Sequence, residues 1–501
     1  MVESNPELKK YSFQRHKPED TVLYKVIQNN WLSFQAQVEE DTGHPLPDFV
    51  IREFEEYFRC GILAHGFLRA QCESCHLEHW VAFSCKRRGL CPSCGARRMN
   101  ETAAHLVDSV LPMKNIRQWV LSFPIPIRLC LAVKPKIMSK ALEITQAEIS
   151  KYYLKKAGFS KTQGKTGAVT LIQRFGGSLN LNVHFHQLFI DGSYELGEQK
   201  EPNGFTPVAE PRKKELDEVL SRIIQRLIRY MEKKKILIKD ESDHLQISLP
   251  EGDGFTMIQS SSVTYRFATG PSKGKKAVVL KSLPERDHTS KSGLVAEAFG
   301  FSLHAGVATL AHERSKLEKI CRYIARPAIS EERLSLNCRG EVVYKLKKPW
   351  DDGTTAIKLT QNELMERLVA LVPRPRVNLI RYHGVLAPNY KYRKQIVPQQ
   401  KIVEPDPLAE AKSKEKQNAK KRMKWAQLLK RVFNIDIETC NRCGGKVKII
   451  AAIEDPPVIK KILDHLGINS SPPKWTSARG PPDEKQPEFF DGELLQAFPE
   501  Y

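Results

Sequence analysis

Two histidines separated by one residue form a candidate metal site. His184 and His186 lie in the run Leu-Asn-Val-His-Phe-His-Gln-Leu-Phe-Ile-Asp at residues 181–191. Its β-branched and aromatic content predicts a strand. Side chains at i and i+2 of a strand point the same way, so both imidazoles can face one divalent ion. The alternative is one solvated histidine and one satisfied core histidine.

A third ligand is expected from the preceding strand. Residues 168–174 and 182–190 predict two strands joined by a glycine-rich turn. If the turn is centred between positions 178 and 179, Gln173 falls directly opposite His184. Two imidazoles and an amide oxygen suit Mg²⁺ or Mn²⁺ with positions open for phosphate oxygens, although affinity alone would also admit Zn²⁺ or Ni²⁺. In a basic chain such a site indicates phosphodiester chemistry.

Tyr323 is the candidate nucleophile. It lies between Arg322 and Arg326, near the end of a helix predicted over residues 305–324. These cations favour the phenolate and can hold a phosphate. An unshifted tyrosine is a weak nucleophile near neutral pH, and metal activation of the phosphate would compensate. The alternative is an ordinary residue beside the apolar stripe of an amphipathic helix.

Two C-x2-C pairs form a second candidate metal site. Cys72, Cys75, Cys91 and Cys94 have nearly the spacing of two knuckles of a structural zinc ribbon. Four thiolates complete a tetrahedral coordination sphere, so we expect this zinc to hold structure rather than to catalyse. Free thiols are the alternative. Any of the other cysteines and histidines nearby could replace a ligand or build a second site: Cys60, Cys85, His65, His76 and His79.

A further C-x2-C pair, Cys440 and Cys443, stands alone near the C-terminus. It is half of a zinc knuckle, with no second pair after it. It is interpreted as a partial or relic zinc site, and completion by Cys338 or a histidine and two free thiols are the alternatives.

Composition indicates a polyanionic partner. The 501 residues carry a formal net charge of +21, and such a field attracts nucleic acid. No apolar run is long enough for a membrane span and the start lacks a secretory signal, so we expect a cytoplasmic protein with no membrane partner. Basic residues around the cysteines favour a DNA-docking surface, with a solvated basic face as the alternative: Lys86, Arg87, Arg88, Arg97 and Arg98.

The chain divides into three expected regions. Residues 1–112 form an N-terminal zinc-binding, DNA-docking domain, and residues 113–388 mix strands and helices in a catalytic domain. Residues 389–501 form a basic linker, a small C-x2-C unit and a disordered tail from Ser470. Within the second region, residues 214–233 have helical periodicity, and residues 263–268 and 277–280 predict short strands.

Taken together these motifs resemble the HUH-superfamily rolling-circle transposases of bacterial insertion sequences, of the insertion sequence ninety-one and common-region type. The resemblance covers most of the chain. The segments that carry it are 83–98, 173–176, 182–192, 321–327, 346–355, 373–377 and 381–388.

The resemblance implies an α+β fold, the HUH endonuclease fold, with an antiparallel sheet, flanking helices and a small N-terminal zinc-binding domain. It implies a nickase and strand transferase for single-stranded DNA of transposon ends and target, acting near the bacterial nucleoid. His184 and His186 would hold catalytic Mg²⁺ or Mn²⁺, separate from the structural Zn²⁺. Tyr323 would form a 5′-phosphotyrosine and free a 3′-hydroxyl.

One position departs from the founding branch of that family, which has two tyrosines four residues apart. The residue four before Tyr323 is Lys319. A homodimer or a free 3′-hydroxyl would then resolve the intermediate; Tyr382, in a strand-like run, is a weaker candidate for a second nucleophile. Two other functions remain open: a plasmid-type replication initiator or relaxase, and a non-catalytic zinc-dependent DNA-binding remnant.

Overall fold

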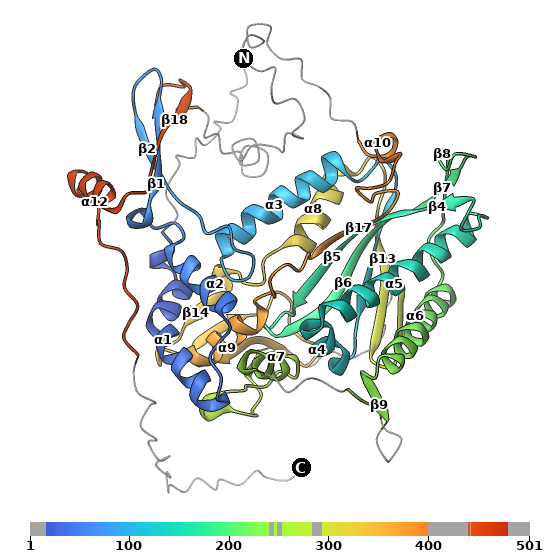
Figure 1. Ribbon diagram of the computed structural model, residues 1–501, viewed down its shortest axis with the longest axis horizontal. Helices are drawn as coiled ribbons and strands as arrows, with labels where there is room; N and C mark the ends of the chain where they lie inside the picture. The colour runs from blue at the N-terminus through green and yellow to red at the C-terminus, as the bar shows by residue number, and fades with distance from the viewer. Residues whose placement is uncertain are drawn as a thin grey trace, which may run out of the picture.

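A six-stranded antiparallel sheet forms the centre of the protein (Figure 1). The structure is a computed structural model and describes residues 17–239, 245–247, 253–282, 293–398, 439–440 and 442–478. Helices pack on both faces of the sheet, which confirms the expected α+β class. The strand order is β12-β13-β3-β6-β5-β17, formed in that order by Val295–Ala298, Phe301–Thr309, Ile116–Ser122, Leu181–Ile190, Gly167–Phe175 and Ile380–Gly384.

Strand β6 is central and is covered on both sides. Because successive side chains of a strand alternate, Phe185 and Phe189 enter the larger core, whereas Leu188 and Ile190 enter a smaller core on the opposite face. Helices α3 and α8, which lie side by side, cover the smaller core (Figure 1). Helices α4, α5 and α6 cover the larger one. The bounds are α3 Pro92–Ser109, α4 Ile125–Val133, α5 Pro135–Lys156, α6 Lys213–Lys233 and α8 Arg314–Ala325.

The N-terminal helices pack against a second layer. Trp31 of α1 stacks on Phe54 of α2 with ring centroids 4.0 Å apart, and this pair anchors the helices in the larger core. A four-stranded antiparallel sheet of order β11-β16-β15-β14 lies beyond them. The elements are α1 Val22–Thr42, α2 Asp48–Arg59, α7 Gly254–Val263, α9 Gln361–Leu371, β11 Val278–Lys281, β14 Leu334–Leu336, β15 Val342–Lys345 and β16 Thr354–Leu359.

Smaller elements complete the described fold. A sheet of order β18-β1-β2 brings the C-terminal part of the chain to the N-terminal part, with Phe67 opposite Ile453. The remaining elements are β1 Phe67–Cys72, β2 Glu78–Ala82, β18 Val447–Ile453, β4 Gly164–Lys165, β7 Gly192–Leu196, β8 Pro202–Pro207, β9 Leu237–Lys239, β10 Leu245–Ile247, α10 Arg393–Ile396 and α12 Pro456–His465. Single 3₁₀ turns lie at Pro18–Asp20, Leu63–His65, Gly270–Ser272 and Glu331–Arg333.

The hairpin that was expected to carry the metal site forms as the sequence predicts. Strands β5 and β6 pair with Gln173 opposite His184. The helix expected over residues 214–233 is α6. Both strands are buried on both faces, so the short turn between Phe175 and Leu181, rather than alternating burial, fixes the register of the hairpin.

Two element predictions were wrong. The helix expected over residues 305–324 is helical only from Arg314, and its first part belongs to strand β13. These residues form a strand because every second side chain is buried, at Phe301, Leu303 and Ala305, and because the backbone pairs with β12 and β3. Residues 263–268 form no strand either: Val263 ends helix α7, and only isolated bridges follow.

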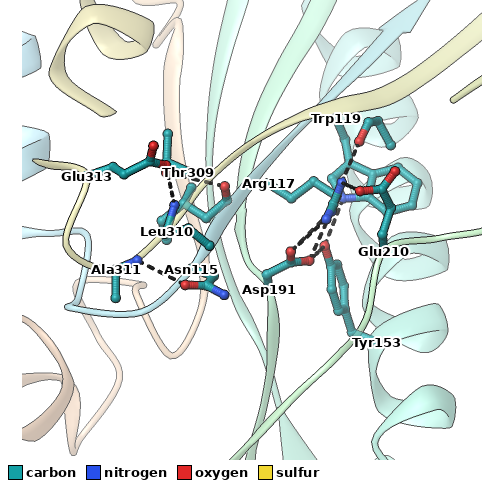
Figure 2. Close-up of polar contacts among 12 residues, drawn as sticks. Asn115, Arg117, Trp119, Tyr153, Asp191, Glu210, Thr309, Leu310, Ala311 and Glu313 are labelled. Atoms are coloured by element: carbon teal, nitrogen blue, oxygen red, sulfur yellow. Dashed lines mark hydrogen bonds and ion pairs between the residues drawn. The ribbon is translucent and has the colours of Figure 1, made fainter. Parts of the chain in front are cut away.

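A buried polar network closes one end of the sheet (Figure 2). Arg117 of β3 donates to both carboxylate oxygens of Asp191, which directly follows β6, at 3.0–3.2 Å. Its Nη1 donates to the Ala305 carbonyl at 3.0 Å. Tyr153 of α5 donates to Asp191 at 2.9 Å and accepts from Trp119 at 3.0 Å. Every group in this network has a partner, so the network ties α5, β3, β6 and β13 together.

The division into three domains stays a prediction. Contacts cross both of the expected domain boundaries. Helix α3 packs on α8, and β18 pairs with β1. The tail expected to be disordered from Ser470 is in place up to residue 478, because Trp475 stacks on Phe58 with centroids 3.7 Å apart. Most of the basic linker, 399–438, lies outside the described residues. Within the part of the chain that the structure covers, no helix is long and apolar enough to cross a membrane.

Candidate active site and zinc centres

His184 and His186 lie side by side on the central strand. Their ring centroids are 4.9 Å apart and the planes are inclined by 66°. Both share a face of β6 with Leu188 and Ile190, so they lie on the side that helices α3 and α8 cover. The expected pairing of two imidazoles on one face is therefore present.

The Nδ1 atom of each ring is engaged. His184 Nδ1 lies 3.0 Å from the Asn182 carbonyl oxygen, which can only accept, so Nδ1 carries the proton and Nε2 keeps a free lone pair. His186 Nδ1 lies 2.7 Å from the amide nitrogen of Gln118. The two orientations of a glutamine amide have the same shape, and with the oxygen turned to Nδ1 the Nε2 atom of His186 is also free. Gln118 can therefore accommodate either tautomer of His186, and it leaves Nε2 free for a metal ion in the orientation that turns its oxygen to Nδ1.

Both imidazoles are held neutral. Burial lowers the pKa of His184 to about 4, with Arg326 and Arg128 adding to the effect against the Asn182 hydrogen bond. Burial lowers the pKa of His186 to about 2, reinforced by His184 and Arg326. A neutral imidazole is the form that binds a metal ion, so this pair fits a divalent cation better than an anion.

Gln173 connects the histidine strand to the tyrosine helix. It lies opposite His184, and its amide nitrogen donates to the Ile324 carbonyl at 2.8 Å. That bond fixes the amide and leaves its oxygen as the available ligand atom. Since Ile324 follows Tyr323 directly, this bond brings the end of α8 to the histidine hairpin.

Tyr323 is exposed to 44% and is surrounded by cations. The guanidinium carbon of Arg326 lies 4.2 Å from the ring centroid, and the ammonium nitrogen of Lys347 lies 4.4 Å from it. Burial acts to raise the pKa of Tyr323, but Arg326, Lys347 and Lys348 outweigh it and hold the pKa below its ordinary value. The phenolate form of Tyr323 is therefore more populated at a given pH than that of a free tyrosine.

The two arginines expected to hold phosphate are placed differently. Arg326 follows the end of α8, donates to the Tyr323 carbonyl at 3.2 Å, and acts electrostatically on the phenol and on both histidines. Arg322 is half-buried on α8, and no contact with the Tyr323 ring occurs in the described part of the structure. Arg326 is therefore the cation shared by the two halves of the site.

Three residues of the site were missed by the sequence interpretation. Gln118 lies on β3, where a polar residue inside a buried strand was the only signal. Lys347 and Lys348 belong to the loop between β15 and β16, in the segment Leu346-Lys-Lys-Pro-Trp. Nothing in the spacing shows that this loop returns to Tyr323.

Eight cysteines form two clusters rather than the expected one. The first consists of Cys60, Cys85, Cys91 and Cys94. Sulfur atoms that contact one another in it are 3.5–3.7 Å apart. Four sulfurs around tetrahedral zinc, each at 2.3 Å, are about 3.8 Å apart, so this cluster has the dimensions of a zinc site.

The second cluster joins the two ends of the described chain. It consists of Cys72, Cys75, Cys440 and Cys443. Cys72 and Cys443 have sulfurs 3.5 Å apart, and those of Cys75 and Cys440 are 3.6 Å apart. The lone C-terminal pair is therefore completed by the first N-terminal pair.

This arrangement corrects the ligand set expected from spacing. Cys72 and Cys75 were grouped with Cys91 and Cys94 around one ion, whereas the structure divides these pairs between the clusters. Backbone N–H groups donate to a sulfur in each cluster, from Cys85 to Cys60 at 3.2 Å and from Ser74 to Cys72 at 3.4 Å. Such bonds favour thiolates, the form that binds zinc.

The first cluster lies beside the end of the tyrosine helix. Cys91 and Cys94 begin α3, which runs antiparallel to α8: a Cβ on Gly95 would meet Pro327, just past α8, at 2.7 Å. At the other end, Arg314 of α8 donates to the Leu111 carbonyl at 3.0 Å. A zinc ion in the first cluster would therefore brace the helix pair that carries Tyr323.

Two family models match the chain, over the regions that contain these residues. The model described as "Transposase zinc-binding domain" matches residues 26–123, and the model described as "Putative transposase" matches residues 167–394. The first match contains six of the clustered cysteines and the second contains His184, Gln173 and Tyr323; Cys440 and Cys443 lie outside both. The fold and these matches define a zinc-binding transposase, a DNA-cutting class of enzyme.

The chain belongs to the transposase family of the insertion sequence ninety-one type. Its partner is accordingly DNA, and the cysteine clusters identify the structural cofactor as zinc. No curated protein and no solved structure matches the chain.

Proposed function

We propose that this transposase nicks single-stranded DNA at the ends of its element with Tyr323 and transfers the strand by rolling-circle transposition. The observation that carries the proposal is the bond from Gln173 to the Ile324 carbonyl. It ties the residue opposite His184 to the residue after Tyr323. Arg326, which acts on the tyrosine and on both histidines, supports the same grouping.

His184, His186 and the amide oxygen of Gln173 would hold Mg²⁺ or Mn²⁺. When bound, the ion polarises the scissile phosphate and neutralises charge on its oxygens. The protein's own part is to keep both imidazoles neutral through burial and to orient them through Asn182 and Gln118. Positioned ligands of this kind lower the reorganisation needed in the transition state.

Tyr323 supplies the nucleophile. Its phenol loses a proton, and its oxygen forms a bond to phosphorus as the bond from phosphorus to the 3′ oxygen breaks. The leaving oxygen takes up a proton and becomes a 3′-hydroxyl, while the 5′ phosphate stays on the tyrosine. Arg326 and Lys347, beside the ring, favour the phenolate and stabilise the added negative charge. The phosphodiester energy is kept in the covalent intermediate.

A single tyrosine would serve this reaction. Lys319 occupies the position where the founding branch has a second tyrosine. Tyr382 lies within β17, paired with Val169 of β5, which argues against a second nucleophile there. Resolution of the intermediate would then fall to a second protomer or to a free 3′-hydroxyl.

The zinc module is a weaker candidate for the DNA-docking surface than its charge suggests. Arg87 pairs with Glu56 at 3.2 Å and Arg97 with Glu101 at 2.9 Å. Arg98 donates to the carbonyls of Lys86 and Arg87. These donors are used within the protein, so the cations around Tyr323 are better placed for the DNA backbone.

The test is a covalent adduct on single-stranded DNA. Zinc-loaded protein is incubated with Mn²⁺ and a pool of single-stranded oligonucleotides that includes element ends, labelled at either terminus, and then denatured. A 5′-phosphotyrosine predicts that the 3′ label stays with the protein, whereas the 5′ label is released on a fragment with a 3′-hydroxyl. Tyr323→Phe should lose the adduct and Tyr382→Phe should keep it.

Each other result counts against a specific part of the proposal. An adduct that survives Tyr323→Phe shows that the nucleophile is wrong. An adduct on the 5′-labelled fragment shows that the polarity is wrong. Binding of the oligonucleotides without any adduct, across the pool and with Mn²⁺ present, identifies a DNA-binding remnant instead.

A further inference from the structure

Arg174 is a buried arginine whose guanidinium is largely without partners. It lies on β5 beside Gln173 and faces the opposite side of the sheet. Only 6% of the residue is exposed, yet its Nε and Nη2 atoms have no hydrogen-bond partner. Its Nη1 reaches the Ala132 carbonyl of α4 at 3.5 Å, a long contact. A buried donor left in this state is costly, which indicates that something else normally binds there.

A second arginine, Arg374, contributes to the same region. It follows α9 in the segment Pro373-Arg-Pro-Arg-Val and acts electrostatically on Arg174. Its Nη2 donates to the Thr256 hydroxyl at 3.3 Å, and its guanidinium carbon lies 5.4 Å from the centre of the Phe255 ring. Its Nε is also buried without a partner. Two elements far apart in sequence therefore direct cations into one region.

No carboxylate neutralises these two cations in the described part of the chain. The nearest acid along the hydrogen bonds is Asp253, which caps α7 and accepts from Thr256, and it forms no ion pair with Arg374. Burial, with Arg374 adding to it, lowers the pKa of Arg174 to about 10, so Arg174 stays charged near neutral pH. Arg117, the other buried arginine of this sheet, has Asp191 as its counter-ion.

The free atoms of Arg174 have the geometry for an oxyanion. Nε and Nη2 lie on one edge of the guanidinium, and that edge binds two oxygens of a carboxylate or phosphate at once. The Nε of Arg374 would supply a third donor. A phosphate group offers enough oxygens to accept from both arginines and enough charge to balance them.

We propose that Arg174 and Arg374 form a binding site for a phosphate group behind the catalytic hairpin. The backbone of the DNA strand is one source, because the site adjoins the hairpin: Phe175, next to Arg174, lies 5.5 Å from the guanidinium of Arg326 at the active site. In that form the inference rests on the proposed function. Free inorganic phosphate has the same chemistry and is the other source.

The first measurement is thermal unfolding of the zinc-loaded, full-length protein in phosphate and in chloride at equal ionic strength. Wild-type protein should gain a saturable rise in its unfolding midpoint with phosphate. Arg174→Met and Arg374→Gln should lose that rise. Arg376→Gln, an exposed arginine two positions away, is the matched control and should keep it. Equal phosphate responses in wild type, Arg174→Met and Arg374→Gln would overturn the site.

The second measurement identifies the source by the salt dependence of single-stranded DNA binding. A DNA phosphate in the site predicts that Arg374→Gln weakens binding and lowers the slope of log K against log salt by about 0.7, the value for one phosphate contact. An unchanged slope, with the phosphate response lost, assigns free phosphate as the ligand. Neither measurement needs Tyr323 to react, so Tyr323→Phe should leave both unchanged, and failure of the nickase proposal is distinguishable.

Discussion

The two ends of strand β6 differ in whether their charged groups have partners within the protein. At the Asp191 end the charged groups of the network are paired: Arg117 has its carboxylate, and Tyr153 is bonded on both sides (Figure 2). At the hairpin end, His184 offers a free ring nitrogen, and no acid among the described residues pairs with Arg174 or Arg326. The same strand therefore carries a closed network that stabilises the fold and an open one whose partners must come from outside. Buried or active-site cations without a counter-ion distinguish the hairpin end as the one that binds.

The largest effect is expected at the open end. His184→Ala should lower cleavage by about 10³-fold or more, equal to about 4 kcal/mol of transition-state stabilisation, because one metal ligand is lost. Its free energy of unfolding should not fall, since the ring has a single hydrogen bond, to the nearby Asn182 carbonyl. Adduct formation and chemical denaturation measured together test this. Unfolding of the variant would show that the open end also supports the fold.

Asp191→Ala should have the largest effect on stability. It leaves Arg117 buried without its carboxylate and removes the acceptor of Tyr153. Loss of one partner of a buried ion pair costs about 3–5 kcal/mol. Chemical denaturation should show this loss, and Glu195→Ala on the neighbouring strand β7 is the exposed control. An unchanged denaturation midpoint would mean that the Asp191 network does not stabilise the fold.

Arg326→Gln tests the electrostatic part of the open end through pH. Arg326 helps to hold the pKa of Tyr323 below its ordinary value, and the reactive phenolate gains population as pH rises. The rate of adduct formation should therefore climb with pH, and in the variant this climb should move to higher pH. Near neutral pH the variant should be slower, because a smaller fraction of Tyr323 is then phenolate. A pH profile that does not move would exclude this role.

Gln118→Leu should weaken metal binding without unfolding the protein. It removes the hydrogen-bond partner of His186 Nδ1, and loss of such an outer partner costs about 10- to 100-fold in metal affinity. Gln118→Glu, whose carboxylate can accept from Nδ1, should retain or strengthen binding. Titration with Mn²⁺ measures both. Equal affinities in both variants would show that the hydrogen bond at His186 Nδ1 does not support metal binding.

The smallest expected effect lies within the closed network. Tyr153→Phe removes one hydroxyl that donates to Asp191 and accepts from Trp119. We expect a loss of about 1 kcal/mol, as for a typical hydrogen bond, and no change in cleavage. Denaturation and adduct assays check both parts. A change in cleavage without a change in stability would show that the Asp191 network influences the active site.

Local rules made the catalytic hairpin predictable. A short turn fixes the pairing of Gln173 with His184, so the position of the proposed third metal ligand followed from the sequence. The cysteine clusters were not predictable in the same way. Spacing tells which cysteines form a knuckle, but which knuckles share an ion depends on β18 pairing with β1. The approach of Lys347 to Tyr323 is likewise a tertiary contact without a local signal.

The second cysteine cluster has a consequence for synthesis of the chain. Cys75 and its partner Cys440 are separated by 365 positions, which a ribosome needs about 20 to 70 s to add at ordinary elongation rates. The first cluster is complete once Cys94 has emerged. During that interval Cys72 and Cys75 can bind only half of a coordination sphere. The second cluster can therefore form only after Cys443 has been synthesised. A chain that ends before Cys443 would lack the link between its N-terminal and C-terminal parts.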